Sequence, residues 1–242
     1  MSERLTALVT GANKGIGTEV VRRLAADGYT VWLGSRDRAR GEAAVAALKG
    51  AGLDVRLLEI DVADDASVTK AAQRLAQETG RLDVLVNNAG IALSLSTPPS
   101  TEAVAQVKAV YEVNVFGPVR VTQAFLPLLK VAPAPRIVMV SSGLASLTRL
   151  VDPASEFYAI NLLSYNSSKT ALNAVTVSFA KELAASGFKV NAADPGYTAT
   201  DLNGHTGYRT VAQAAEIILK LATLPADGPT AGFFDDQGAE SW

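Results

Sequence analysis

The chain has 242 residues, with 22 basic and 24 acidic side chains, a single histidine and no cysteine. This length suffices for one large domain with a substantial core, and the absence of cysteine excludes a disulfide framework, an iron–sulfur centre and a thiol nucleophile. One imidazole, His205, is too few for a histidine-based metal site, so no metal is expected, and a net charge of −2 offers no basic surface for nucleic acid.

The N-terminal sequence Met1-Ser2-Glu3-Arg4-Leu5 leads directly into a short apolar run, without the basic region and long apolar region of a secretory signal. No apolar run reaches the length that spans a membrane. We therefore expect a soluble, cytoplasmic protein that has neither nucleic acid nor a membrane as its partner.

Short apolar segments alternate with amphipathic segments of helical length along the whole chain. They predict strands near residues 5–10, 30–34, 54–60, 82–86, 136–140, 188–193 and 231–234. Their nearly continuous apolar character is typical of strands buried on both faces of a parallel sheet. Asp64 is expected to cap the third helix, and residues 101–130 are expected to be helical, with kinks or ends at Pro118 and Pro127. Because no repeat or linker divides residues 1–242, we predict a single α/β domain with a doubly wound parallel sheet of about seven strands and helices on both faces.

The first strand leads directly into a glycine-rich turn, Thr10-Gly11-Ala12-Asn13-Lys14-Gly15-Ile16-Gly17, which opens a helical pattern. Glycines allow a tight turn, a close approach of the backbone to a pyrophosphate, and close packing of helix on strand. The helix N-terminus adds free N–H groups and the positive end of its dipole. Such glycines also occur in plain tight turns, but their place between the first strand and the first helix favours a dinucleotide site.

The end of the second strand indicates which dinucleotide is bound. An NAD-binding protein carries an acidic residue there for the ribose hydroxyls, whereas this chain has Arg36, with Lys14 in the glycine turn. Two cations near the adenosine ribose match a 2′-phosphate, so we expect NADP(H) to be preferred. Asp37 is the competing feature, because a strand that ended later would turn Asp37 toward the ribose and favour NAD(H).

Polar motifs follow the later strands. After the third and fourth strands come Asp61-Val62 and Asn87-Asn88-Ala89-Gly90, and the next helix contains Asn114. After the fifth strand come Ser141 and Ser142, then a helix with Tyr165 and Lys169, and the sixth strand is followed by Pro195-Gly196-Tyr197-Thr198. The carboxyl ends of parallel strands form the ligand-binding edge of such sheets, so these motifs are expected at one site.

Tyr165 and Lys169 carry the main chemical signal. Their spacing places both side chains on one helix face, and of the six tyrosines only Tyr165 has a lysine four residues later. This spacing is common on helix surfaces, but here it follows a dinucleotide turn. Hydride delivery to a carbonyl builds negative charge on the oxygen, which requires a proton donor, and a neighbouring cation lowers the pKa of tyrosine from about 10.

In this order, the motifs resemble those of the compact branch of the short-chain dehydrogenase/reductase family, over essentially the whole chain. The resemblance implies a Rossmann fold and a carbonyl reductase that converts a ketone or aldehyde into an alcohol. Tyr165 would be the general acid, Lys169 would lower its pKa and bind the nicotinamide ribose, and Ser142 rather than Ser141 would bind the substrate oxygen. Asn114 would hold a water that links Lys169 to solvent.

The resemblance also implies a set of cofactor contacts, in which Asp61 and Val62 flank the adenine and Thr198 meets the nicotinamide carboxamide. The expected cofactor-binding residues are Gly11, Asn13, Lys14, Gly15, Ile16, Gly17, Arg36, Asp61, Val62, Asn88, Ala89, Gly90, Tyr165, Lys169, Pro195, Gly196 and Thr198. The family usually pairs through the helix that bears the tyrosine, so a homodimer or homotetramer is expected.

Ser142 and Tyr165 are 23 positions apart, farther than is common in the family. The inserted segment, within residues 143–164, is rich in apolar residues. It either lines the pocket, which favours a hydrophobic or aromatic carbonyl substrate, or packs on the domain or a second subunit. A second substrate loop is expected at 196–209, where His205 is interpreted as an ordinary exposed histidine rather than a substrate contact.

Three other functions compete with NADPH-dependent carbonyl reduction. One is an NAD(H)-dependent secondary-alcohol dehydrogenase, and another is an NADP(H)-binding sensor without chemistry. The presence of both Tyr165 and Lys169 argues against the sensor. The third is an epimerase or dehydratase of the extended family branch, against which the glycine spacing and the chain length both argue.

Overall fold

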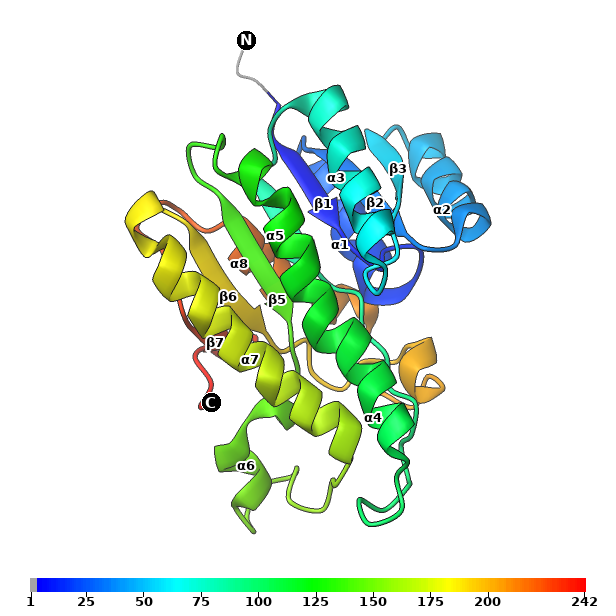
Figure 1. The fold of residues 1–242 in the computed structure, drawn as a ribbon, viewed down its shortest axis with the longest axis vertical. Coiled ribbons are helices and arrows are strands. Elements are labelled where there is room, and N and C mark those ends of the chain that lie inside the picture. Colours follow the sequence, from blue (N-terminus) through cyan, green and yellow to red (C-terminus); the bar gives the residue numbers. More distant parts are fainter. Residues whose placement is uncertain (1–3) are drawn as a thin grey trace.

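Seven parallel strands form one sheet in the order β3-β2-β1-β4-β5-β6-β7 (Figure 1). The computed structural model describes residues 4–242, so Met1–Glu3 of the N-terminal sequence considered above lie outside the described residues. The strands are β1 (Thr6–Val9), β2 (Thr30–Ser35), β3 (Val55–Glu59), β4 (Val84–Asn87), β5 (Arg136–Val140), β6 (Lys189–Ala193) and β7 (Phe233–Phe234). Each coincides with a predicted strand, and all neighbouring pairs are parallel, which confirms the predicted fold class.

Helices cover both faces of the sheet. One face packs against α1 (Gly15–Ala26), α2 (Arg38–Gly50) and α8 (Val211–Ala222). The other packs against α3 (Asp65–Thr79), α5 (Gly117–Leu129) and α7 (Leu163–Leu183), which cross in front of the strands in Figure 1. Shorter helical segments are α4 (Val104–Tyr111), α6 (Leu147–Val151) and the 3₁₀ turns η2 (Gly143–Ala145), η3 (Ala184–Ser186) and η4 (Asp201–Asn203). Within residues 4–242, no helix combines the length and apolar character needed to cross a bilayer.

Alternate residues of the central strands enter opposite cores. In β1, Ala7 and Val9 contact the α1/α8 side, whereas Leu8 contacts the α3/α5 side, and β2 places Trp32 on that second side as well. Successive side chains of a strand point to opposite faces, so a strand covered by helices on both sides must be apolar throughout. This geometry explains the continuous apolar runs.

Side-chain caps fix the starts of two helices. Asp64 accepts hydrogen bonds from the N–H groups of Ala66 (2.8 Å) and Ser67 (3.1 Å), which confirms it as the N-cap of α3. Asp37 caps α2 in the same way through the N–H of Arg40 (3.0 Å). Each carboxylate satisfies amides that have no partner in the first helical turn.

The helix predicted over 101–130 is interrupted by a π-helical turn, η1 (Glu112–Phe116), between α4 and α5. Pro118 lies in the first turn of α5 and has no N–H for the carbonyl of Asn114, four residues back, so the helix widens there. Pro127 lies inside α5 and does not end it. The irregular turn therefore lies at Asn114, a predicted site residue.

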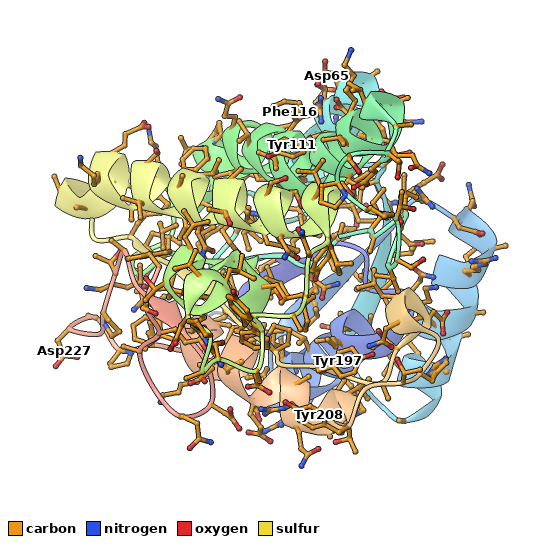
Figure 2. The ribbon with its side chains drawn as sticks, turned by 90° about the horizontal axis from the view of Figure 1, so that it is seen from below. Asp65, Tyr111, Phe116, Tyr197, Tyr208 and Asp227 are labelled. Carbon is orange, nitrogen blue, oxygen red and sulfur yellow. The ribbon has the colours of Figure 1, made fainter. Side chains whose placement is uncertain are left out.

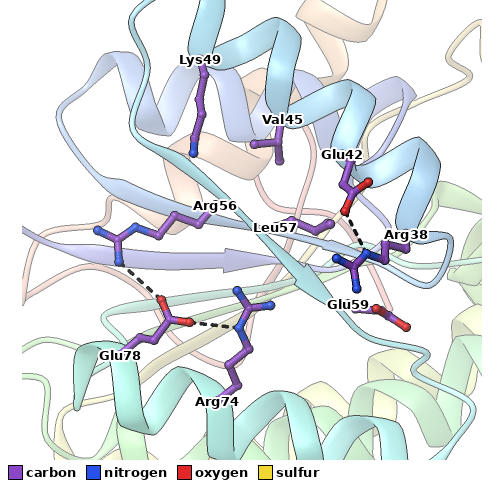
Figure 3. A pocket seen from close by; sticks show the side chains of 9 residues that line it. All are labelled: Arg38, Glu42, Val45, Lys49, Arg56, Leu57, Glu59, Arg74 and Glu78. Carbon is purple, nitrogen blue, oxygen red and sulfur yellow. Dashed lines mark hydrogen bonds and ion pairs between the residues drawn. The ribbon is translucent and has the colours of Figure 1, made fainter.

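A pocket opens at the edge strand β3, between α2 and α3 (Figure 3). Within its charged lining, Arg38 pairs with Glu42, and both Arg56 and Arg74 pair with Glu78. None of the predicted site residues lines it. The site must instead be sought where the strand order reverses, between β1 and β4.

Candidate active site

The glycine turn packs tightly against the end of β4. Gly11 and Gly15 both have φ of +61°, a conformation that favours glycine. A Cβ on Gly11 would lie 2.8 Å from the Cα of Ala89, and one on Gly17 would lie 2.6 Å from the side-chain nitrogen of Asn88. The three glycines thus allow the turn, α1 and the Asn88-Ala89 segment to meet without side chains between them.

Hydrogen bonds join the same two segments. The Nδ2 atom of Asn88 donates to the carbonyls of Thr10 (2.9 Å) and Gly11 (3.1 Å). In return, the Thr10 hydroxyl accepts the N–H groups of Asn88 (3.0 Å) and Ala89 (3.1 Å). Asn88 therefore acts within the protein as a brace for the glycine turn, and Thr10 is a supporting residue that the sequence analysis did not single out.

Arg36 and Asp37 adopt different roles at the end of β2. The strand ends at Ser35, Arg36 is exposed, and its guanidinium forms no ion pair with any residue from 4 to 242. Asp37 is engaged as the cap of α2 and pairs with Arg40 at 3.2 Å. The structure therefore does not place Asp37 on an extension of β2, as the NAD(H) alternative requires.

Lys14 occupies the N-cap position of α1 and forms an ion pair with Asp201 (2.6 Å), in the loop after β6. Asp201 also contacts the exposed ring of His205 at 2.8 Å. The loop start is close to the glycine turn as well, since a Cβ on Gly15 would lie 3.6 Å from the Thr200 methyl. The predicted loop 196–209 is thus attached to the glycine turn.

Tyr165 and Lys169 lie on one face of α7, with the lysine Nζ 5.8 Å from the centroid of the tyrosine ring. The Tyr165 hydroxyl is hydrogen-bonded to Ser142, and Lys169 donates to the Val140 carbonyl at 2.8 Å. The structure therefore brings together the predicted serine, tyrosine and lysine from β5 and α7.

Burial dominates the electrostatics of this pair. It raises the pKa of Tyr165 to about 12, against the hydrogen bond from Ser142, and lowers the pKa of Lys169 to about 8. The direction for Tyr165 is opposite to the lowering that the resemblance implied. At the pH where this phenol would ionise, Lys169 has already lost its proton and no longer attracts the phenolate.

Ser141 and Ser142 point to different partners. The buried Ser141 hydroxyl donates to the Asn173 side chain of α7 at 2.7 Å. Ser142 caps the short η2 turn, accepting the Leu144 N–H at 3.2 Å, and faces Tyr165. Only Ser142 of the two is hydrogen-bonded to the tyrosine.

Asn114 is held in the π-helical turn by an amide pair with Ile91. Its Oδ1 accepts the Ile91 N–H (2.8 Å), and its Nδ2 donates to the Ile91 carbonyl (2.9 Å) and to the Ser168 hydroxyl (3.0 Å). A Cβ on Gly90 would lie 3.5 Å from both Asn114 Oδ1 and Lys169 Nζ. Gly90 therefore lies between Asn114 and Lys169, where a larger residue would contact both. Ser168 is a second supporting residue, which the sequence pattern did not indicate.

The remaining predicted contacts lie in the glycine turn and in the segments after β3 and β6. Gly196 has φ of +71°, and the buried Thr198 donates to the carbonyls of Pro195 (3.2 Å) and Gly196 (3.1 Å). The Asp61 carboxylate accepts the Ala63 N–H at 3.0 Å, and Val62 is buried against Gly117. Asn13 and Ile16 are half-buried in the glycine turn.

The inserted segment folds back on the turn after β5 that contains Ser142 and Gly143, which we call the serine turn. A Cβ on Gly143 would lie 2.8 Å from the Phe157 ring, which also lies under the Arg149 guanidinium at 4.1 Å. In contrast, Leu147, Val151 and Tyr158 are exposed. In the loop after β6, Tyr197 and Tyr208 contact each other edge-on, with centroids 6.0 Å apart (Figure 2). Apolar groups are therefore present on both loops beside the site.

Comparison with known proteins supports the assignment of the fold. A family model described as short chain dehydrogenase matches residues 5–209. The (−)-isopiperitenone reductase of Mentha piperita is 35% identical over 94% of this chain and 95% of that protein. Carbonyl reductase [NADPH] 3 of Mus musculus is 32% identical over 98% of both chains. The solved structure of NADPH-bound carbonyl reductase from chicken fatty liver superposes with a TM-score of 0.86, at 27% identity, over 99% of this chain and 100% of that chain.

The chain belongs to the short-chain dehydrogenase/reductase family, and its relatives over the full length define it as an oxidoreductase.

Proposed function

We propose that the protein is an NADPH-dependent carbonyl reductase that converts a ketone or aldehyde into an alcohol. The observation that carries the proposal is the juxtaposition of Ser142, Tyr165 and Lys169 beside a glycine turn at the carboxyl edge of the sheet. The names of the mouse relative and the chicken structure indicate NADPH, and the mint relative is named as a reductase.

The residues around the glycine turn fit a phosphorylated dinucleotide. Gly11 and Gly17 leave the turn without side chains, and the N-cap residue Lys14 gives the first N–H groups of α1 no side-chain acceptor. Arg36 is exposed and unpaired among residues 4–242, so its guanidinium is available to a 2′-phosphate. Asp37, the residue that would favour NAD(H), is occupied as a helix cap.

The bound cofactor supplies the hydride, and the protein supplies the proton and the electrostatics. Ser142 donates a hydrogen bond to the substrate oxygen, and Tyr165 transfers its phenolic proton to that oxygen as negative charge builds there. With its pKa raised to about 12, Tyr165 holds this proton at neutral pH. Lys169 is mostly cationic at pH 7 and favours the phenolate that is left, while Asn114 supports a water through which Tyr165 regains its proton.

We infer a hydrophobic or aromatic carbonyl substrate from the loops beside Ser142. Phe157 packs on Gly143 of the serine turn, and Tyr197 and Leu202 are exposed on the loop after β6. These side chains offer apolar and aromatic surface but no unpaired charge. Homodimer or homotetramer formation and a cytoplasmic location stay predictions.

A panel of aldehydes, aliphatic and aromatic ketones and quinones, assayed with NADPH and with NADH at the nicotinamide absorbance, tests the proposal. We expect turnover of the apolar carbonyls, with NADPH favoured. Turnover only of secondary alcohols with NAD would favour the alternative dehydrogenase. Tight NADPH binding without any turnover would favour a sensor.

A further inference from the structure

A buried carboxylate that the mechanism above does not use lies beside the active site. Asp194 directly follows β6 and is 6% exposed. Its Oδ1 atom accepts the backbone N–H of Gly196 at 2.8 Å, and its carboxylate also accepts the backbone N–H of Gly143. One side chain thus joins the turn after β6 to the turn after β5, where Ser142 lies.

Gly143 is shaped to receive this carboxylate. A Cβ at position 143 would lie 2.8 Å from Asp194 Oδ2 and 2.8 Å from the Phe157 ring. Real side chains do not tolerate such distances, so only glycine allows the carboxylate and the ring to approach the backbone from two sides. The contact between Asp194 and the serine turn therefore depends on glycine at position 143.

The charge of Asp194 is held by backbone amides rather than by a cation. Among residues 4–242 it forms no ion pair, because Arg149 donates to Glu240 and Arg209 donates to Asp236 (2.8 and 2.9 Å). The titratable groups that face it are Tyr165 and Lys169 of α7, Arg149 of α6, Arg209 before α8, and Asp235 and Glu240 after β7.

When ionised, the Asp194 carboxylate acts on both groups in the same sense. Burial raises the pKa of Asp194 and Asp235 adds to that rise, whereas the N–H groups of Gly196 and Gly143 and the Arg149 guanidinium oppose it. The negative charge raises the pKa of Lys169 by favouring its ammonium form, and raises the pKa of Tyr165 by disfavouring a phenolate. Both effects favour the protonated forms of Tyr165 and Lys169.

We propose that Asp194 is a positioning residue that holds the Ser142 turn against the Gly196 turn and, through its buried charge, biases the site toward carbonyl reduction over alcohol oxidation. Reduction starts from the protonated phenol, whereas oxidation needs the phenolate as a base. The inference rests on the proposed function, which assigns these roles to Tyr165.

The test replaces Asp194 by asparagine, which keeps an oxygen acceptor for the Gly196 N–H and removes the charge. In ¹³C-lysine-labelled protein, with the Lys169 signal assigned from Lys169→Arg, we expect the Lys169 titration midpoint to fall by about one pH unit. At pH 6, where Lys169 keeps its proton in both proteins, the ratio of oxidation to reduction kcat should rise about tenfold for a matched alcohol and ketone pair.

Asp227→Asn is the control. It removes an exposed carboxylate that does not influence Asp194, Tyr165 or Lys169, so both readouts should equal those of the wild type. An unchanged Lys169 midpoint in Asp194→Asn would overturn the inference. The titration needs no substrate, so a chain that reduced none of the carbonyls would contradict the proposed function alone.

Gly143→Ala provides a second route if Asp194→Asn does not fold. Its methyl group would displace the Asp194 carboxylate, so we expect a lower kcat at unchanged KM for NADPH and a Lys169 midpoint shifted downward. Wild-type values of both quantities in Gly143→Ala would contradict the positioning role.

Discussion

The hydroxyl of Tyr165 is the proton donor that the proposed function assigns to this site. Tyr165 lies on α7, and its hydroxyl is hydrogen-bonded to Ser142 at the end of β5. Burial raises its pKa to about 12, so the hydroxyl is a donor throughout the neutral range. The Lys169 ammonium approaches the same ring but is held by the Val140 carbonyl. In the proposed reaction, the tyrosine therefore gives up its proton only when negative charge develops beside it.

Replacing Tyr165 by phenylalanine should lower the kcat of carbonyl reduction by roughly 10²- to 10⁴-fold, because the general acid is lost. The Kd of NADPH, measured by quenching of protein fluorescence, should rise by no more than about tenfold, since one hydroxyl contributes about one hydrogen bond. Tyr158→Phe removes a phenol from the exposed part of the inserted segment and is expected to leave kcat unchanged. Full turnover in Tyr165→Phe would contradict the assignment of Tyr165 as the acid.

At the scale of elements, the sequence predicts the strands but not the contacts that hold the site residues in place. Apolar runs and the glycine turn depend on neighbours in sequence, so the seven strands and the start of α1 agree with expectation. The π-helical turn around Asn114 depends on a helix widening before Pro118, which periodicity does not reveal. Lys14–Asp201 and Asp194–Gly143 join residues far apart in the chain, and only the assembled sheet edge brings them together.

The predicted cap of α3 provides a test at this scale. Asp64→Ala removes the acceptor of two amides and should lower the free energy of unfolding by about 1 kcal/mol, or the melting temperature by roughly 2–4 °C. Asp64→Asn keeps an acceptor and should recover most of this loss, which separates capping from the charge on the helix dipole. Thermal denaturation followed by circular dichroism measures both variants. Equal losses in the two would mean that the charge, not the cap, stabilises α3.

At the scale of the whole molecule, the sheet has two halves, β3-β2-β1 and β4-β5-β6-β7, which meet where β1 pairs with β4. The glycine turn and Arg36 belong to the first half, whereas Ser142, Tyr165, Lys169 and Thr198 belong to the second. A dinucleotide that contacts both halves is linked to the stability of the entire fold, because it binds the folded state and not the unfolded chain.

NADPH at 100 times its Kd should therefore stabilise the protein by about 2.7 kcal/mol and raise the melting temperature by roughly 5–10 °C. NADH at the same concentration should give a smaller rise, because Arg36 has no 2′-phosphate to bind. In Arg36→Ala the NADPH shift should fall to the NADH value, whereas Lys49→Ala, which removes a cation from the far end of α2, should keep the difference. Equal shifts for the two cofactors in the wild type would mean that Arg36 does not select the 2′-phosphate.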